Sequence, residues 1–347
     1  MLVNRQRLIY SKYGKRQTGS VLCRYHARRL LPLHAPMPSD ASSPPAVSSY
    51  PRATLVGLSA VLCWSTSVGL FRSVAEHLGP IGGAASVFTA SALLVTLRFG
   101  LPRVAQLRKM HPAYLWGCGL LFVLYEIALS LSLGFASNRT QTLELGMINY
   151  LWPSLTIVLA TVFGLQRFRI GLVPGVLLAM AGIVLVLKGD SALSIASVWA
   201  NVQSNPLAYG LAFAAAWLWP CYSVLSKRYA HGANALPAFL WAVAAVLWAK
   251  YAFSAENALQ WSVPAVLQLG MLSGLTALGY SCWDYGIRHG NLTVMAVGSY
   301  FTPVLSALVG TVWLQVQPGW SFWQGVALVT LGSLICWWCT RQPRNKQ

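Results

Sequence analysis

Three carboxylates lie inside long apolar stretches of this 347-residue chain. Glu126 lies near the middle of its stretch, whereas Glu144 and Asp284 lie toward the ends of theirs. If these stretches cross a membrane, a carboxylate at such a depth is costly and should face a cavity or a partner. For Glu126 this predicts a site for a proton or an amine; the alternative is a buried carboxyl, hydrogen-bonded by Tyr or Ser, that only holds helices together. For Glu144 and Asp284 we favour a structural role near the membrane interface.

Two prolines, 150 positions apart, follow the same local pattern of a polar residue, Tyr, two further residues and Pro. A proline within a helix removes the hydrogen bond to the carbonyl four residues earlier. Pro153 therefore frees the carbonyl of Asn149, and Pro303 frees that of Ser299. Transporters place solute sites in such interrupted helices, and irregular backbone in a membrane needs protein or water beside it. We predict a functional pair of breaks; the alternative is two kinks packed against neighbouring helices.

Aromatic residues with a polar atom surround these positions: Trp64, Tyr125, Tyr150, Trp152, Trp217, Trp219, Tyr222, Tyr280, Trp283 and Tyr300. Trp and Tyr at the ends of membrane spans are ordinary interface anchors. Tyr125, Tyr150, Trp152, Tyr280 and Tyr300 are too central for that role. Such residues suit a pocket for a planar, partly apolar solute that a few polar groups orient.

Enzyme and cofactor motifs are missing from the sequence. The six His lie in the N-terminal tail or in predicted loops, no GxxxxGK[ST] motif is present, and Ser273 has no His at comparable depth. Cys336 and Cys339 have CxxC spacing, but they end an apolar stretch without a second Cys pair or a His nearby. We therefore expect no enzyme, no cofactor, no metal and no catalytic residue.

The composition places these residues in a membrane. The chain is 56% hydrophobic and 9% charged, whereas soluble domains are about half apolar and about a quarter charged. Stretches of about 20 apolar residues, each able to cross a ~30 Å hydrocarbon core, predict an all-α membrane protein with ten transmembrane helices. We expect these helices at residues 54–73, 81–99, 112–134, 142–163, 170–188, 206–228, 236–254, 264–286, 292–314 and 321–339.

A duplication relates the two halves of the chain. Besides the proline segments, GVLLAMAG at 175–182 matches GVALVTLG at 325–332 at the same offset, and Gly57 with Trp64 matches Gly210 with Trp217 at an offset of 153. Five helices per repeat is an odd number, so the second repeat crosses the membrane in the opposite sense. The sequence thus predicts two inverted five-helix repeats.

The distribution of positive charge predicts the orientation. If both termini are cytoplasmic, most of the 25 Lys and Arg lie on the inner side, as the positive-inside rule requires. The net charge of +18 then suits anionic lipid headgroups, and no soluble domain is left for a nucleic-acid surface. The outer side holds only Arg72, Arg139, Lys188 and Lys250.

The chain divides into four predicted regions. Residues 1–50 are basic and rich in Pro and Ser, which predicts a disordered leader; a targeting or lipid-binding tail and a start at Met37 are the alternatives. Residues 51–190 form the first five-helix repeat, 191–341 the second, and 342–347 a cytoplasmic tail.

Six short stretches resemble one known family. They are similar to the bacterial inner-membrane aromatic amino acid exporters in the EamA branch of the drug/metabolite transporter superfamily, and the resemblance runs from about Arg52 to Arg341. The long basic leader departs from it. The stretches are LCWST at 62–66, LGPIGGAA at 78–85, YEI at 125–127, NYLWPS at 149–154, GSYFTPV at 298–304 and FWQG at 322–325.

The resemblance implies a ten-helix basket around a central cavity, with the fifth and tenth helices peripheral, and the outward transport of amino acids, aromatic ones foremost. Carried over position by position, it implies a site formed by Trp64, Ser65, Tyr125, Glu126, Asn149, Tyr150, Trp152, Ser299 and Tyr300. Tyr280, Pro153 and Pro303 join this site from the aromatic and proline arguments above.

The predicted function is alternating-access export of aromatic and other amino acids, with a small-molecule substrate, the lipid bilayer and no obligatory protein partner. A carrier for other metabolites or drugs would differ in the cavity lining rather than in the fold. A non-transporting scaffold would not need polar, Pro-broken helices, and an intramembrane enzyme would form product without a gradient.

Overall fold

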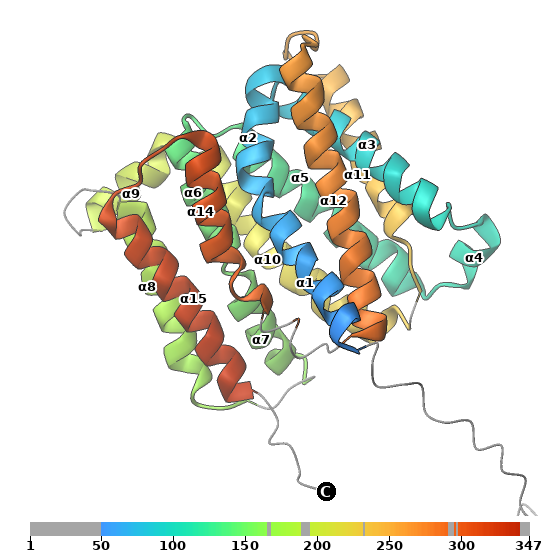
Figure 1. The fold of residues 1–347 in the computed structure, drawn as a ribbon. Coiled ribbons are helices and arrows are strands. Elements are labelled where there is room, and N and C mark those ends of the chain that lie inside the picture. The colour runs from blue at the N-terminus through green and yellow to red at the C-terminus, as the bar shows by residue number, and fades with distance from the viewer. Residues whose placement is uncertain are drawn as a thin grey trace, which may run out of the picture. The chain divides into compact units, whose positions relative to one another are not determined.

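The computed structural model describes residues 50–164, 168–188, 195–231, 233–290, 295 and 298–340. The predicted leader up to residue 49, the predicted tail and the side chain of Asp284 lie outside the described residues. Within them the regular elements are all helices (Figure 1). In chain order these are α1 (Tyr50–Ser65), α2 (Ser67–Leu78), α3 (Pro80–Phe99), α4 (Val104–Lys109), the π-helix η2 (Ala113–Cys118), α5 (Gly119–Gly134), α6 (Arg139–Asn149), α7 (Trp152–Val162), α8 (Leu172–Lys188), α9 (Ile195–Ser204), α10 (Pro206–Tyr229), α11 (Leu236–Ala252), α12 (Val263–His289), α14 (Thr302–Leu314) and α15 (Trp320–Thr340).

Among the described residues, six helices are long and apolar enough to cross a membrane, or seven if the bent α1–α2 pair counts as one span. Three further helices, α8, α11 and α14, are apolar but shorter than these candidate spans. Each of the ten predicted segments therefore contains a helix. The short helices α4 and α9 were not predicted.

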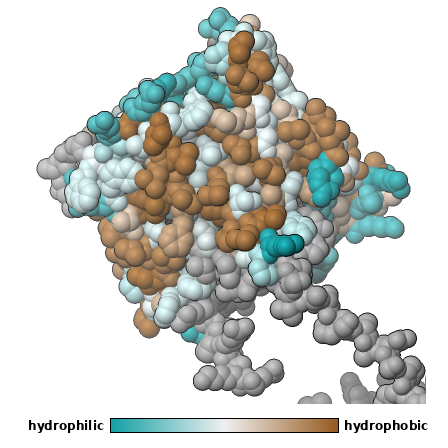
Figure 2. Space-filling model, in the orientation of Figure 1, coloured by the Kyte–Doolittle hydropathy of each residue, from teal (hydrophilic) through white to brown (hydrophobic). Residues whose placement is uncertain are grey.

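Large apolar side chains cover much of the outer surface. Leu97 on α3 and Val312 on α14 are 75% and 78% exposed. Figure 2 shows apolar side chains spread over one face of the helices and polar ones gathered toward its edges. A surface of this kind is stable against lipid tails rather than water.

Two helices are interrupted at the predicted prolines. α6 ends at Asn149, residues 150 and 151 form a turn, and α7 begins at Trp152 with Pro153 as its second residue. In the second half residues 300 and 301 form a turn, and α14 begins with Pro303 as its second residue. A proline fits there because the first amide groups of a helix have no partner within it.

Close antiparallel pairs of helices, one from each half of the chain, build the bundle. α8 packs on α15 through facing glycines, because a Cβ at Gly175 would lie 2.9 Å from the carbonyl oxygen of Gly332, and one at Gly182 would lie 2.7 Å from that of Gly325. α1 packs on α12, α3 on α11 and α5 on α10. Small residues allow helix backbones in membranes to approach this closely.

Candidate functional site

Glu126 lies at the contact between α5 and α12. Its side chain is buried, and Tyr280 donates a hydrogen bond to Glu126 Oε1. We expected a hydrogen bond from Tyr or Ser as the sign of a structural role for Glu126, and Tyr280 provides one. The hydrogen bond does not exclude a transport role, because a buried hydrogen-bonded carboxyl can also exchange a proton or bind an amine.

Aromatic rings surround this hydrogen bond on the side of α1. Trp64 contacts Tyr280 edge to face at 5.9 Å between ring centroids, and it contacts Trp283 at 5.2 Å. Phe122, one turn before Glu126 on α5, lies 6.0 Å from Tyr280. α1 can bring Trp64 so near because Gly279 has no side chain: a Cβ there would lie 2.9 Å from Trp64 Nε1.

The rings continue from Phe122 to α10 and α7. Phe122 contacts Tyr222 at 5.4 Å, and Tyr222 contacts Trp219 at 5.3 Å. Trp219 in turn contacts Tyr125 at 4.7 Å and Trp152 at 6.3 Å. We call this set the aromatic cluster: Trp64, Phe122, Tyr125, Trp152, Trp219, Tyr222, Tyr280 and Trp283.

Asn149 joins the aromatic cluster from the end of α6. Its side chain is buried and lies beside that of Tyr125. Trp152 follows three residues later, across the turn before Pro153. The interruption therefore presents Asn149 and Trp152 together, from two short helices.

The remaining predicted site residues lie elsewhere. Ser65 is buried, and its hydroxyl donates to the carbonyl of Val61 in its own helix. Tyr150 is buried in the main core and lies beside Ser306 on α14.

Tyr300 belongs to a separate apolar cluster with Ile157, Leu172 and Cys336, formed by α7, α8 and α15. Ser299 and Pro303 are buried beside Tyr300 in the chain. The structure therefore brings together Trp64, Tyr125, Glu126, Asn149, Trp152 and Tyr280, and it leaves Tyr300 outside this group.

Phe122, Trp219, Tyr222 and Trp283 complete the aromatic cluster although they were not among the predicted site residues. Phe122 has no polar atom and escaped the search for aromatics with one. Helical spacing contains the missed signal: Trp219 with Tyr222 and Tyr280 with Trp283 are three residues apart, which places each pair on one face of its helix.

The other described carboxylates outside the aromatic cluster have structural partners. Glu144 accepts hydrogen bonds from Tyr209 on α10 and from Asn201 on α9, the latter at 3.0 Å. This agrees with the structural role that we favoured for Glu144. Glu76 pairs with Arg72 and Arg139 at 2.9 and 2.8 Å.

Glu256 caps the start of α3, where the amide of Ile81 donates to it at 2.9 Å. Glu126 differs from Glu76, Glu144 and Glu256 because, of these four carboxylates, it is the one that lies within the aromatic cluster.

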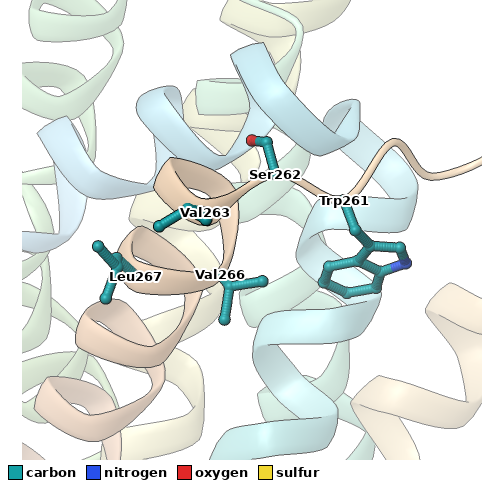
Figure 3. A pocket seen from close by; sticks show the side chains of 5 residues that line it. All are labelled: Trp261, Ser262, Val263, Val266 and Leu267. Atoms are coloured by element: carbon teal, nitrogen blue, oxygen red, sulfur yellow. The ribbon is translucent and has the colours of Figure 1, made fainter.

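A surface hollow of about 490 Å³ lies at the start of α12 (Figure 3). Trp261, Ser262, Val263, Val266 and Leu267 line it, so its polar side-chain groups are the Ser262 hydroxyl and the Trp261 indole N–H. Val266 and Tyr280 are 14 residues apart on one helix, or about 21 Å along its axis. The hollow is therefore distinct from the aromatic cluster.

Residues 206–338 match the model of the EamA-like transporter family. Over 291 residues the chain is 45% identical to the aromatic amino acid exporter YddG of Escherichia coli strain K12, covering 84% of this chain and 98% of that protein. It is 29% identical to the aromatic amino acid exporter YddG of Ancylobacter novellus, covering 82% and 96%. A protein of known crystal structure, 27% identical, aligns with a TM-score of 0.59 over 83% of this chain and 96% of its own. The chain thus belongs to the EamA-like transporter family and is a multi-pass membrane transporter, not an enzyme.

Proposed function

We propose that this transporter exports aromatic amino acids across the bacterial inner membrane. The observation that carries the proposal is the aromatic cluster: eight rings from α1, α5, α7, α10 and α12 contact one another in series, and one of them, Tyr280, donates a hydrogen bond to the buried Glu126. Rings of this kind stack on an indole or phenyl ring, and a few polar groups among them orient the rest of the solute. The similarity to aromatic amino acid exporters over 84% of the chain supports the same solute class.

The proposed architecture has ten spans in two inverted repeats. The six long helices, the α1–α2 pair and the three shorter apolar helices correspond to the ten predicted segments. The packing supports the inversion, because α1 corresponds to α10 and α5 to α12 in such a repeat. The pairs α1–α12 and α10–α5 are then equivalent, and α3–α11 and α8–α15 each join two corresponding helices.

Alternating access follows from this architecture. The two halves rock around the interruptions before Pro153 and Pro303, so that a central cavity beside the aromatic cluster opens to each side in turn. Both termini are cytoplasmic in this proposal. The flanking Lys and Arg support that orientation.

The transport experiment uses inverted membrane vesicles and labelled tryptophan. Vesicles with the wild-type chain should accumulate tryptophan, and Trp219→Leu should reduce the rate because it removes the ring that contacts Tyr125, Trp152 and Tyr222. Trp338→Leu is the matched control, since Trp338 lies on α15 and is 60% exposed. Vesicles without tryptophan accumulation, or equal losses in the two variants, would contradict the proposal.

The same vesicles test what drives export. The sequence contains no P-loop motif, so we propose that the solute gradient or a proton supplies the energy. Glu126→Gln removes the titratable group of the aromatic cluster. If Glu126 carries the proton, the variant loses the response of accumulation to an imposed pH step; if the solute gradient drives export, the variant keeps wild-type facilitated flux.

A further inference from the structure

The side-chain oxygen of Asn149 is a buried acceptor without a donor. Asn149 is 5% exposed, and among the residues that the structure describes no donor reaches its Oδ1. Most buried polar atoms in proteins have a hydrogen-bond partner, because water no longer solvates them. An acceptor held in this condition is suited to a donor that arrives with a ligand.

Asn149 lies at the edge of the aromatic cluster. Its side chain is beside Tyr125, whose ring contacts Trp219 at 4.7 Å. An amide has both a donor and an acceptor end, and the acceptor end of Asn149 is the one without a partner among the described residues. Asn149 is also the last residue of α6, directly before the turn that leads to Trp152.

Two other buried acceptors lack a donor among the described residues, namely Gln268 Oε1 and Thr311 Oγ1. Gln268 lies 12 residues before Tyr280 on α12, or about 18 Å along the helix. Thr311 lies near the far end of α14. Only Asn149 lies among the rings of the aromatic cluster, so only its oxygen is placed for the solute of that site.

We propose that Asn149 Oδ1, together with the Tyr125 and Trp219 rings, forms the subsite for the α-ammonium group of the transported amino acid. This rests on the proposed function. A protonated primary amine supplies the missing donor, and the faces of Tyr and Trp rings attract a cation. A carboxylate cannot serve, because it has no hydrogen to donate and an amide oxygen repels it.

The second half of the chain does not repeat this subsite. Position 299 corresponds to 149 and is Ser, and the Ser299 carbonyl accepts a hydrogen bond of 2.6 Å from Thr302 Oγ1. The residue that corresponds to Thr302 is Trp152, which has no hydroxyl. The Asn149 amide of the ammonium subsite therefore has no counterpart amide in the second half.

The test compares three ligands that share an indole ring: tryptophan, tryptamine, which lacks the carboxylate, and indole-3-propionate, which lacks the amine. Their affinities are measured on the purified full chain by competition with labelled tryptophan. Asn149→Leu keeps the size of the side chain but removes the acceptor. We expect it to weaken tryptophan and tryptamine roughly tenfold or more, and indole-3-propionate less than about twofold.

Asn149→Asp keeps an acceptor at the same place and adds a negative charge. We expect it to retain or strengthen tryptamine binding and to weaken indole-3-propionate. Thr311→Val is the control, because it removes another unpartnered oxygen on α14, a helix that contributes no ring to the aromatic cluster, and should change none of the three affinities.

Two results would overturn the ammonium subsite. One is an equal loss of all three ligands in Asn149→Leu, which marks a structural role; the other is a loss of tryptamine in Asn149→Asp as large as in Asn149→Leu. Failure of the wild-type chain to bind tryptophan would instead overturn the proposed function.

Discussion

The hydroxyl of Tyr280 donates a hydrogen bond to the carboxylate of Glu126, and the two residues are 154 positions apart in the chain. Glu126 comes from α5 in the first half and Tyr280 from α12 in the second. The contact therefore joins the two halves at a buried acidic group, within the aromatic cluster. We expect the stability of the fold and the proposed function to depend on the hydrogen bond that Tyr280 donates to the Glu126 carboxylate.

Tyr280→Phe should destabilise the protein. The change leaves the Glu126 carboxylate without the donor that the structure gives it, and an unsatisfied buried acceptor costs about 1–3 kcal/mol. Thermal unfolding of the protein in detergent measures the effect. The double variant Tyr280→Phe with Glu126→Leu should be more stable than Tyr280→Phe alone, because both ends of the bond are then apolar. If the losses of stability in Tyr280→Phe and in Glu126→Leu add up to the loss in the double variant, the two side chains are not directly coupled.

Glycine packing between α8 and α15 gives a second test. A Cβ at Gly182 would lie 2.7 Å from the Gly325 carbonyl oxygen and 2.8 Å from the Val329 amide nitrogen, so backbone must move. We expect Gly182→Ala to lower the free energy of unfolding by about 1–3 kcal/mol. In Gly210→Ala the new Cβ meets no atom within 4 Å, and alanine favours the helix by about 1 kcal/mol. Equal unfolding temperatures for the two variants would refute the close packing.

The helices could be predicted from the sequence because apolar runs of span length leave little choice in a membrane. The bend between α1 and α2, by 40° at Thr66, was not predicted, since no Pro or Gly marks it. Two hydroxyl groups bond to the backbone at this bend. Thr66 Oγ1 donates to the Cys63 carbonyl at 2.7 Å and Ser65 Oγ to that of Val61, and such bonds to the backbone bend helices.

Six of the twelve predicted site residues lie together in the structure. Residue type and depth pointed to them, because residues such as Glu126, Asn149 and Trp152 are unusual in the middle of a membrane span. The position of Tyr300 could not be predicted in this way. Tyr150 and Tyr300 occupy matching places in the two repeats, yet Tyr150 packs in the main core and Tyr300 against Ile157 and Cys336. Which way a ring turns after a helix break depends on neighbouring helices, and a single sequence does not specify their faces.

Membrane orientation is the third test. If both termini are cytoplasmic, cysteines placed at Arg139 and Lys250 should react with a membrane-impermeant maleimide from the outside of intact spheroplasts. Cysteines at Arg108 and Lys109 should react only after the membrane is permeabilised. All four side chains are exposed or partly exposed, so access depends on the side of the membrane. The background replaces the native cysteines with serine or alanine, and the opposite pattern of labelling would reverse the orientation.

The paired helix interruptions provide the last test. Pro153→Ala together with Pro303→Ala restores an amide hydrogen at the second residue of α7 and of α14, so each helix can continue through the turn that precedes it. We expect the export of labelled tryptophan to fall roughly tenfold, because hinge changes alter turnover without touching the solute. Pro264→Ala is the matched control, since Pro264 also occupies the second position of its helix but begins α12 at the surface. The double variant should unfold at nearly the wild-type temperature. A loss of export then reflects impaired movement of the two halves rather than unfolding. Wild-type export from a well-folded double variant would show that the halves do not move about these turns.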